Sequence, residues 1–300
     1  MRALPLLAVL LALAGCAGPS PEPAVPTGLS LTESVEAIVA RYPGATVAVA
    51  VRRTAPGDTV VYGRNAGRPF HAASTMKVPV MIEAFRQVDA GRRAWADSVR
   101  VENRFRSIVD GSEYAIEDDT DDALYALLGT DLPLRNLVER AITTSSNLAT
   151  NLLIQALTAD SVQATTDRLG ASGMRVLRGV EDLKAFEAGL SNRTTVDALA
   201  TLLEALAAGR AVSPAADAEM IGVLEAQEFD EMIPAGLPPG TRVAHKTGWI
   251  TRADHDAAVV YPEAAAPYVL VILTEGLDDH ADSARLGAEV TRAVHAALAR

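Results

Sequence analysis

Strand-like segments stand near both ends of this chain, and a long stretch with a helical pattern separates them. Short β-like runs bounded by turn residues predict five strands, at residues 45–52, 59–62, 242–247, 256–261 and 268–274. Strands at both ends with helices inserted between them favour one sheet assembled from the two ends of the chain. We therefore expect an α/β (α+β) fold: a five-stranded antiparallel sheet flanked by helices, with an inserted all-helical lobe at about residues 74–240.

The spacing of apolar residues predicts seven helices. One follows a cap at Thr32 to Ser34 and has an apolar stripe of Val35, Ile38 and Val39, and the others cover residues 75–88, 134–142, 148–157, 195–208, 214–226 and 283–298. Gly209 follows one of them, and Ser213-Pro214 suits the cap and first turn of the next. A site at the seam between the sheet and the helical lobe would be natural in such a fold.

The amino-terminal region has a separate character. A positive start at Met1-Arg2 precedes an apolar run up to Ala14, which predicts an export signal peptide over residues 1–15. The run is too short to span a bilayer, which takes roughly 20 residues. It ends in Leu13-Ala14-Gly15-Cys16, which resembles the lipobox of bacterial lipoproteins and so implies lipidation of Cys16. An ordinary cleaved signal with an incidental cysteine is the alternative.

A proline-rich segment follows Cys16. Four prolines among small residues predict a semi-extended tether over residues 16–30, which would hold a folded domain over residues 31–300 away from a membrane. The domain would then be exported, on the periplasmic side of a bacterial membrane.

Charge and motif content argue against several classes of protein. The net charge is −11 and there is no basic run, so we expect no nucleic-acid partner. The five histidines show no metal-ligand spacing, and the acidic run at residues 117–122 lacks the glycine and terminal glutamate of a calcium loop. We take that run as a solvated helix start, and we expect no metal and no cofactor. No Gly-x-Ser-x-Gly run occurs, which argues against an α/β-hydrolase.

Lysine is rare in this chain. Only three of its 27 basic residues are lysines, namely Lys77, Lys184 and Lys246. A desolvated ammonium can give up its proton whereas a guanidinium cannot, so a proton relay requires lysine rather than arginine. Two of the three lysines stand in motifs that could carry chemistry.

Three motifs follow one another along the chain. Ser74-Thr75-Met76-Lys77 places a hydroxyl and an amine about one turn apart at the start of a helix. Ser145-Ser146-Asn147 places a hydroxyl and an amide in a turn between two helices. Lys246-Thr247-Gly248 ends a strand, where glycine permits close approach and the other two side chains could hold a carboxylate. Each motif alone has an ordinary structural explanation as a helix cap or a glycine turn.

Together, in this order, the motifs resemble the signature of class A β-lactamases and penicillin-binding proteins. The resemblance extends over about residue 31 to the carboxyl terminus. It implies that Ser74 is the acylated nucleophile, that Lys77 relays protons, and that Ser145 protonates the leaving nitrogen. It further implies that the Ser74 and Trp249 N–H groups form an oxyanion hole.

The same resemblance implies the groups that bind substrate. Asn147 would contact the substrate side-chain amide, and Lys246, Thr247 and Gly248 would adjoin its carboxylate. Arg252 is the candidate for a further carboxylate ligand, although Asp254 and Asp256 would oppose an anion if they face the cleft.

Two departures from the family pattern stand out. Ser146 occupies the position where aspartate is usual. The family also uses a glutamate in a Glu-x-x-x-Asn loop to activate water; here Glu181 is the candidate base, but alanine stands at position 185. Glu187 is a second candidate, a solvated loop carboxylate is the alternative for Glu181, and Asp182 suits a cap or an ion pair.

The sequence therefore predicts a serine β-lactamase-like hydrolase that acts on a β-lactam or a cell-wall peptide as a monomer, attached to the membrane only by its lipid. A D,D-peptidase or another penicillin-reactive amidase on the same fold is the nearest alternative. A non-catalytic cell-envelope binding lipoprotein is the other.

Overall fold

The structure is a computed structural model that describes residues 29–54 and 60–299. The predicted signal peptide, Cys16 and all of the tether up to residue 28 lie outside the described residues. Within the described part of the chain, no helix combines the length and apolarity needed to cross a membrane.

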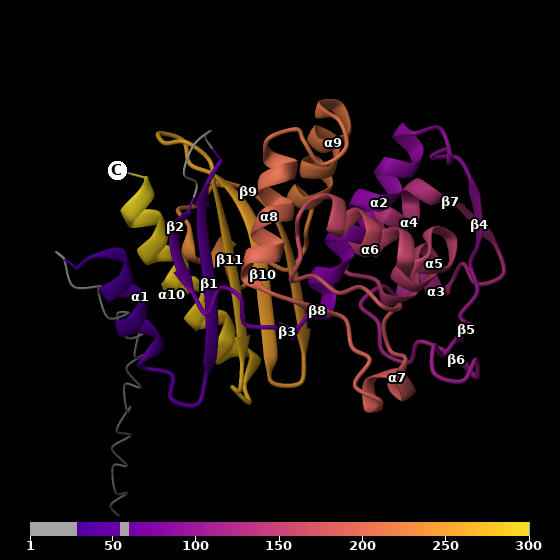
Figure 1. The fold of residues 1–300 in the computed structure, drawn as a ribbon, viewed down its shortest axis with the longest axis horizontal. Coiled ribbons are helices and arrows are strands. Elements are labelled where there is room, and N and C mark those ends of the chain that lie inside the picture. Colours follow the sequence, from indigo (N-terminus) through magenta and orange to yellow (C-terminus); the bar gives the residue numbers. More distant parts are fainter. Residues whose placement is uncertain (1–28, 55–59, 300) are drawn as a thin grey trace, which may run out of the picture.

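A five-stranded antiparallel sheet forms the centre of the fold, in the order β2-β1-β11-β10-β9 (Figure 1). Its strands are β1 (Thr46–Arg53), β2 (Val60–Arg64), β9 (Arg242–Ile250), β10 (Ala253–Tyr261) and β11 (Tyr268–Glu275). The first two come from one part of the chain and the last three from another, and β1 joins the two groups by pairing with β11, for example Val49 with Ile272. The predicted sheet, assembled from both ends of the chain, is confirmed.

Two helices cover one face of the sheet. These are α1 (Leu31–Val39) and α10 (His280–Leu298), which pack on each other and on the residues of that face (Figure 1). The helix α1 begins at Leu31, ahead of the predicted cap at Thr32 to Ser34, because Ser30 and Glu33 form a reciprocal capping box. The opposite face packs against α8 (Val196–Ala207) and through it joins a second, larger core.

The helical lobe lies beside this second face and fills the other half of the molecule (Figure 1). Its remaining helices are α2 (Lys77–Asp89), α3 (Asp122–Tyr125), α4 (Leu134–Thr143), α5 (Asn147–Leu157), α6 (Ala159–Arg168), α7 (Leu183–Glu187) and α9 (Pro214–Glu225). Four of them match predicted helices to within two residues. The sequence pattern did not predict α3, α6 and α7, which have four to ten residues each.

The lobe is not all-helical, and that prediction is wrong in this respect. Short strands form three two-stranded ladders, β3 (Phe70–His71) with β8 (Arg193–Thr194), β4 (Ser98–Arg100) with β7 (Asp131–Pro133), and β5 (Phe105–Arg106) with β6 (Glu113–Tyr114). Strands of two or three residues are too short to show the alternation on which strand prediction depends. The ladder of β3 with β8 matters for the site, because it leads into the turn that carries Ser74.

Candidate active site

Ser74 lies on a 3-10 turn, Ala73–Met76, that leads directly into α2. The turn packs against β9, the edge strand of the sheet, at Gly248. A Cβ atom on Gly248 would stand 2.6 Å from the Ser74 nitrogen, so only glycine permits this approach. The third motif therefore contacts the backbone of the first.

Ser145 lies in the turn between α4 and α5, with a positive φ of 58°. Ser146 caps α5, and its hydroxyl accepts the N–H of Ala149. This turn aims both the carbonyl and the hydroxyl of Ser145 at the lysine of the first motif.

The two motif lysines meet at the Ser145 hydroxyl. Lys77 Nζ lies 3.3 Å from Ser145 Oγ, 2.5 Å from the Ser145 carbonyl oxygen and 2.9 Å from Asn147 Oδ1. Lys246 Nζ donates to Ser145 Oγ at 3.0 Å and to the Thr247 carbonyl oxygen at 2.9 Å. The structure thus brings together one residue set from all three predicted motifs.

Burial shifts the protonation of both amines. Neither Lys77 nor Lys246 is exposed to solvent. Desolvation lowers the pKa of Lys77 to about 7, against the opposing charges of Asp119 and Glu181. Desolvation and the neighbouring Lys77 charge lower the pKa of Lys246 well below its ordinary value. A neutral amine is therefore accessible near neutral pH, as a proton acceptor requires.

Asp119 braces the turn of the second motif. Its carboxylate accepts the backbone N–H groups of Asn147 and Leu148, both at 2.8 Å, and the Ser146 hydroxyl at 3.3 Å. The description of residues 117–122 as merely a solvated helix start is wrong for this residue. Asp119 supplies, from another loop, the carboxylate that Ser146 does not provide, and nothing in the local sequence pattern indicated it.

Glu181 reaches the same cluster. Its Oε1 accepts the Asn147 side-chain amide at 2.8 Å, and its Oε2 accepts the Glu117 N–H at 3.0 Å. Because Asn147 also contacts Lys77, the Glu181 carboxylate lies one residue away from the lysine cluster. Burial raises the pKa of Glu181, although these hydrogen bonds oppose the shift. A solvated loop carboxylate is therefore the wrong description of Glu181.

The loop around Glu181 is held by polar side chains that sequence reasoning did not single out. Asn151 on α5 accepts the Val180 N–H at 2.6 Å and donates to the Val180 carbonyl at 3.0 Å. A Cβ atom on Gly179 would stand 2.1 Å from Asn151 Oδ1, so glycine lets α5 approach the loop. Asp182 caps α7, which was one of its two predicted roles, and its carboxylate also accepts the Ser107 hydroxyl.

The other loop residues are placed differently. Glu187 is exposed at the end of α7, and the structure does not bring it into the cluster. Ala185 is fully buried and offers no polar group at the position where the family pattern has asparagine.

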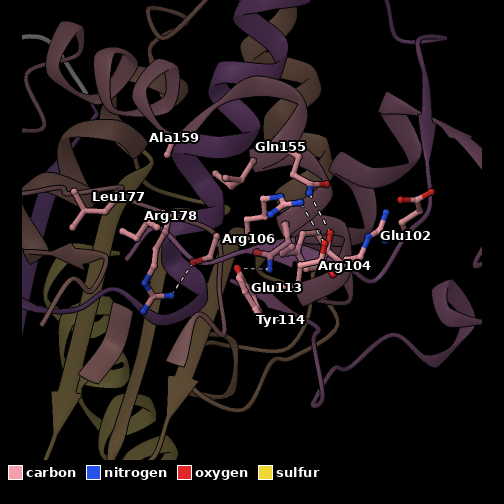
Figure 2. A pocket seen from close by; sticks show the side chains of 14 residues that line it. Glu102, Arg104, Arg106, Glu113, Tyr114, Gln155, Ala159, Leu177 and Arg178 are labelled. Carbon is pink, nitrogen blue, oxygen red and sulfur yellow. Dashed lines mark hydrogen bonds and ion pairs between the residues drawn. The ribbon is translucent and has the colours of Figure 1, made fainter. Parts of the chain in front are cut away.

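A pocket of about 460 Å³ adjoins this loop (Figure 2). Asn151, Gly179 and Arg178 line it together with Arg104, Gln155 and other residues of α5 and the β5–β6 segment. Figure 2 shows the Arg178 guanidinium turned away from Arg104 and Gln155 and bonded to the Gly179 carbonyl at 2.9 Å. The pocket lies outside the lysine cluster.

A second cavity, of about 280 Å³, lies beside the end of β9. Thr247 and Trp249 line it, and the buried Thr247 hydroxyl has no hydrogen-bond partner among the described residues. The Trp249 ring is partly exposed and packs edge-on against Phe229. The predicted substrate-binding hydroxyl is thus buried and makes no hydrogen bond within the described part of the chain.

Arg252 does not join this cavity. It lies on the turn between β9 and β10, where its guanidinium contacts Asp278 at 2.6 Å and the Gly276 carbonyl at 2.7 Å. Its predicted role as a carboxylate ligand therefore finds no support in the geometry. Asp254 lines the cavity, where it would oppose an anion, and its carboxylate contacts His280 at 2.5 Å; Asp256 does not line the cavity and contacts His245 at 3.1 Å.

Comparison with known proteins agrees with this geometry. The β-lactamase enzyme family matches residues 30–298. The chain is 32% identical to a β-lactamase of Bacillus amyloliquefaciens over 49% of its own length and 50% of that protein. It is 28% identical to β-lactamase CTX-M-6 of Salmonella typhimurium, over 85% of this chain and 84% of that one.

A solved structure gives the same result. The β-lactamase of Sphaerobacter thermophilus superposes with a TM-score of 0.75 at 29% identity, over 89% of this chain and 96% of that chain. The chain belongs to the β-lactamase enzyme family and is a serine β-lactamase-like hydrolase.

Proposed function

We propose that this protein opens the amide of a β-lactam through an acyl-enzyme on Ser74 and then hydrolyses that intermediate. The observation that carries the proposal is the Ser145 hydroxyl, which lies within 3.3 Å of Lys77 Nζ and 3.0 Å of Lys246 Nζ. A binding module has little need for two buried amines around one hydroxyl, whereas proton transfer in acyl exchange needs such a relay.

In acylation, Ser74 Oγ would attack the lactam carbonyl while its proton passes to neutral Lys77. The N–H groups of Ser74 and Trp249 would stabilise the negative charge that develops on the carbonyl oxygen. As the C–N bond breaks, the leaving nitrogen would take a proton from Ser145, which recovers one from Lys77. Lys246 would hold the Ser145 hydroxyl in place.

Deacylation would use Glu181. Its carboxylate would take a proton from water, the resulting hydroxide would add to the ester carbonyl, and Ser74 Oγ would recover a proton as it leaves. The burial that raises the pKa of Glu181 makes its carboxylate a stronger base. With alanine at position 185, Glu181 would hold this water without the usual amide partner.

The cavity beside Thr247 is the candidate site for a substrate carboxylate, although Asp254 and Glu231 also line it and would oppose an anion. Thr247 would donate its hydroxyl, which has no partner among the described residues, to that carboxylate, and the buried Lys246 amine would be a second donor. Asn147 would contact the substrate side-chain amide. We further propose that the enzyme acts as a monomer, exported and lipid-anchored through Cys16 on the periplasmic side of a bacterial membrane.

One assay tests the catalytic proposal. Purified enzyme is mixed with a chromogenic cephalosporin, and both the initial burst and the steady rate are recorded. Steady turnover that Ser74→Ala abolishes is the expected result. If the substrate acylates no residue at all, the proposal is wrong and a binding protein that keeps the cleft is left.

A second candidate function is D,D-peptidase or penicillin-reactive amidase activity, which the missing amide at position 185 favours. That function predicts one equivalent of product in the burst and then almost no steady rate. It also predicts release of D-alanine from a D-Ala-D-Ala peptide. Fast steady hydrolysis of the cephalosporin without peptide cleavage excludes it.

A further inference from the structure

Two histidines enclose the turn that precedes Ser74. Ala73 has a φ of 45°, in the left-handed region that residues other than glycine rarely adopt. Its N–H donates to His71 Nδ1 at 3.1 Å. The carbonyl of His71 in turn accepts from His255 Nε2 at 2.8 Å. The backbone immediately before the nucleophile therefore depends on imidazole groups of β3 and β10.

These contacts fix the tautomers of both rings. His71 Nδ1 accepts an N–H and so carries no proton, which leaves the ring proton on Nε2. His255 Nε2 faces a carbonyl oxygen and so carries the proton. The Nδ1 atom of His255 is buried and has no partner among the described residues. The His71 ring is accordingly neutral in this arrangement, and burial lowers the pKa of His255.

The surroundings oppose a charge on His71. Arg193 stands opposite it in the ladder of β3 with β8, Arg178 approaches from the Glu181 loop, and His255 approaches from β10. The Phe186 ring of α7 lies 6.0 Å away and adds no charge. Burial and these neighbouring groups lower the pKa of His71 to about 4.

We propose that His71 is a positioning residue for Ser74, because its neutral ring accepts the Ala73 N–H and so holds the left-handed turn that presents the nucleophile. A proton on Nδ1 would set two donors against each other and remove this support. The Ser74 hydroxyl and N–H, which directly follow Ala73, would then lose their alignment. The inference rests on the proposed role of Ser74 as the nucleophile.

Three variants separate the acceptor role from the volume of the ring. His71→Asn keeps an oxygen acceptor where Nδ1 stands and does not titrate. His71→Leu removes the acceptor. Ala73→Gly in the His71→Leu background removes the steric cost of positive φ. His295→Asn is the matched control, since His295 also has a lowered pKa but lies on α10 and bonds to Tyr268.

Acylation by a fluorescent penicillin is measured in single turnover at pH 7. We expect His71→Leu to lose about tenfold to a hundredfold in rate, since a misplaced reacting group costs up to about that factor. His71→Asn and His295→Asn should stay within about threefold of wild type. The added Ala73→Gly should restore part of the loss. Circular dichroism checks that each variant is folded.

The pH profile gives an independent readout. Wild type should lose about a further factor of two by pH 4, where half of His71 carries a proton, and His71→Asn should not. A merely structural histidine would leave these two profiles parallel. Equal profiles, or His71→Leu acylating at the wild-type rate, would overturn the inference.

Failure of the proposed function would look different. If wild-type Ser74 takes no penicillin, amide hydrogen exchange of residues 72–76 still reports the turn. Faster exchange in His71→Leu, slowed again by Ala73→Gly, would then uphold the role of His71 in holding the turn. Unchanged exchange would reject that role without any reference to β-lactams.

Discussion

The lysines proposed to act in acylation and the glutamate proposed to act in deacylation are held in different ways. Lys77 and Lys246 are fully buried, and each amine contacts at least two oxygen atoms between α2, the α4–α5 turn and β9. Glu181 is only half-buried on a surface loop. Its Oε1 accepts the Asn147 side-chain amide, and its Oε2 accepts the Glu117 N–H. The proposed acylation thus depends on the buried lysine cluster, whereas the proposed deacylation depends on one half-buried carboxylate and its loop.

Lys77→Arg should give the largest effect. The guanidinium keeps the charge but cannot release its proton, so acylation loses its base and should fall by about a thousandfold. Single-turnover acylation by penicillin measures this. Lys184→Arg is the matched control, because Lys184 is exposed and paired with Asp110. Acylation of Lys77→Arg within tenfold of wild type would show that acylation does not need Lys77 as its base.

Glu181→Gln should slow deacylation alone. Glutamine cannot accept the proton of water, so deacylation should fall by about a hundredfold or more while acylation stays within about threefold. Intact-protein mass spectrometry would detect the trapped acyl-enzyme. Glu187→Gln, on the exposed end of α7, should hydrolyse substrate at the wild-type rate. Equal steady turnover in both variants would remove Glu181 from the mechanism.

The pH dependence of acylation follows from Lys77. Its pKa is lowered to about 7, and only the neutral amine accepts a proton. The acylation rate should therefore level off above about pH 8 and fall about tenfold per pH unit below about pH 6. Stopped-flow measurement of kcat/KM between pH 5 and pH 9 tests this. A profile that is flat across that range would mean that Lys77 is not the base.

The sequence predicted the lysine cluster better than the surroundings of the Glu181 loop. Ser74, Lys77, Ser145 and Lys246 stand in short motifs that lie in a long strand or directly beside long helices, where periodic patterns are strong. Asp119 and Asn151 form hydrogen bonds with residues 28 to 29 positions away in the sequence, so no local pattern indicates their roles. The unexpected residues are thus those whose partners are set only by the packing of one loop against another.

Arg252 is a predicted substrate-binding residue that the tertiary structure directs elsewhere. On the strand-end pattern alone it could point toward a carboxylate, but the hairpin turn has a φ of 61° at Arg252 and aims its side chain at Asp278. The pair is exposed on both sides, and such pairs contribute about 0 to 1 kcal/mol to stability.

Arg252→Gln should therefore give the smallest effect on catalysis. Glutamine can still donate to the Gly276 carbonyl, and no charge that faces the lysine cluster is lost. KM for a carboxylate-bearing cephalosporin should stay within about threefold of wild type, whereas Thr247→Val, which removes the free hydroxyl of the cavity, should raise it more. A tenfold rise in KM in Arg252→Gln alone would show that the turn opens and that the guanidinium reaches the substrate. It would also make the hairpin turn part of the substrate-binding site.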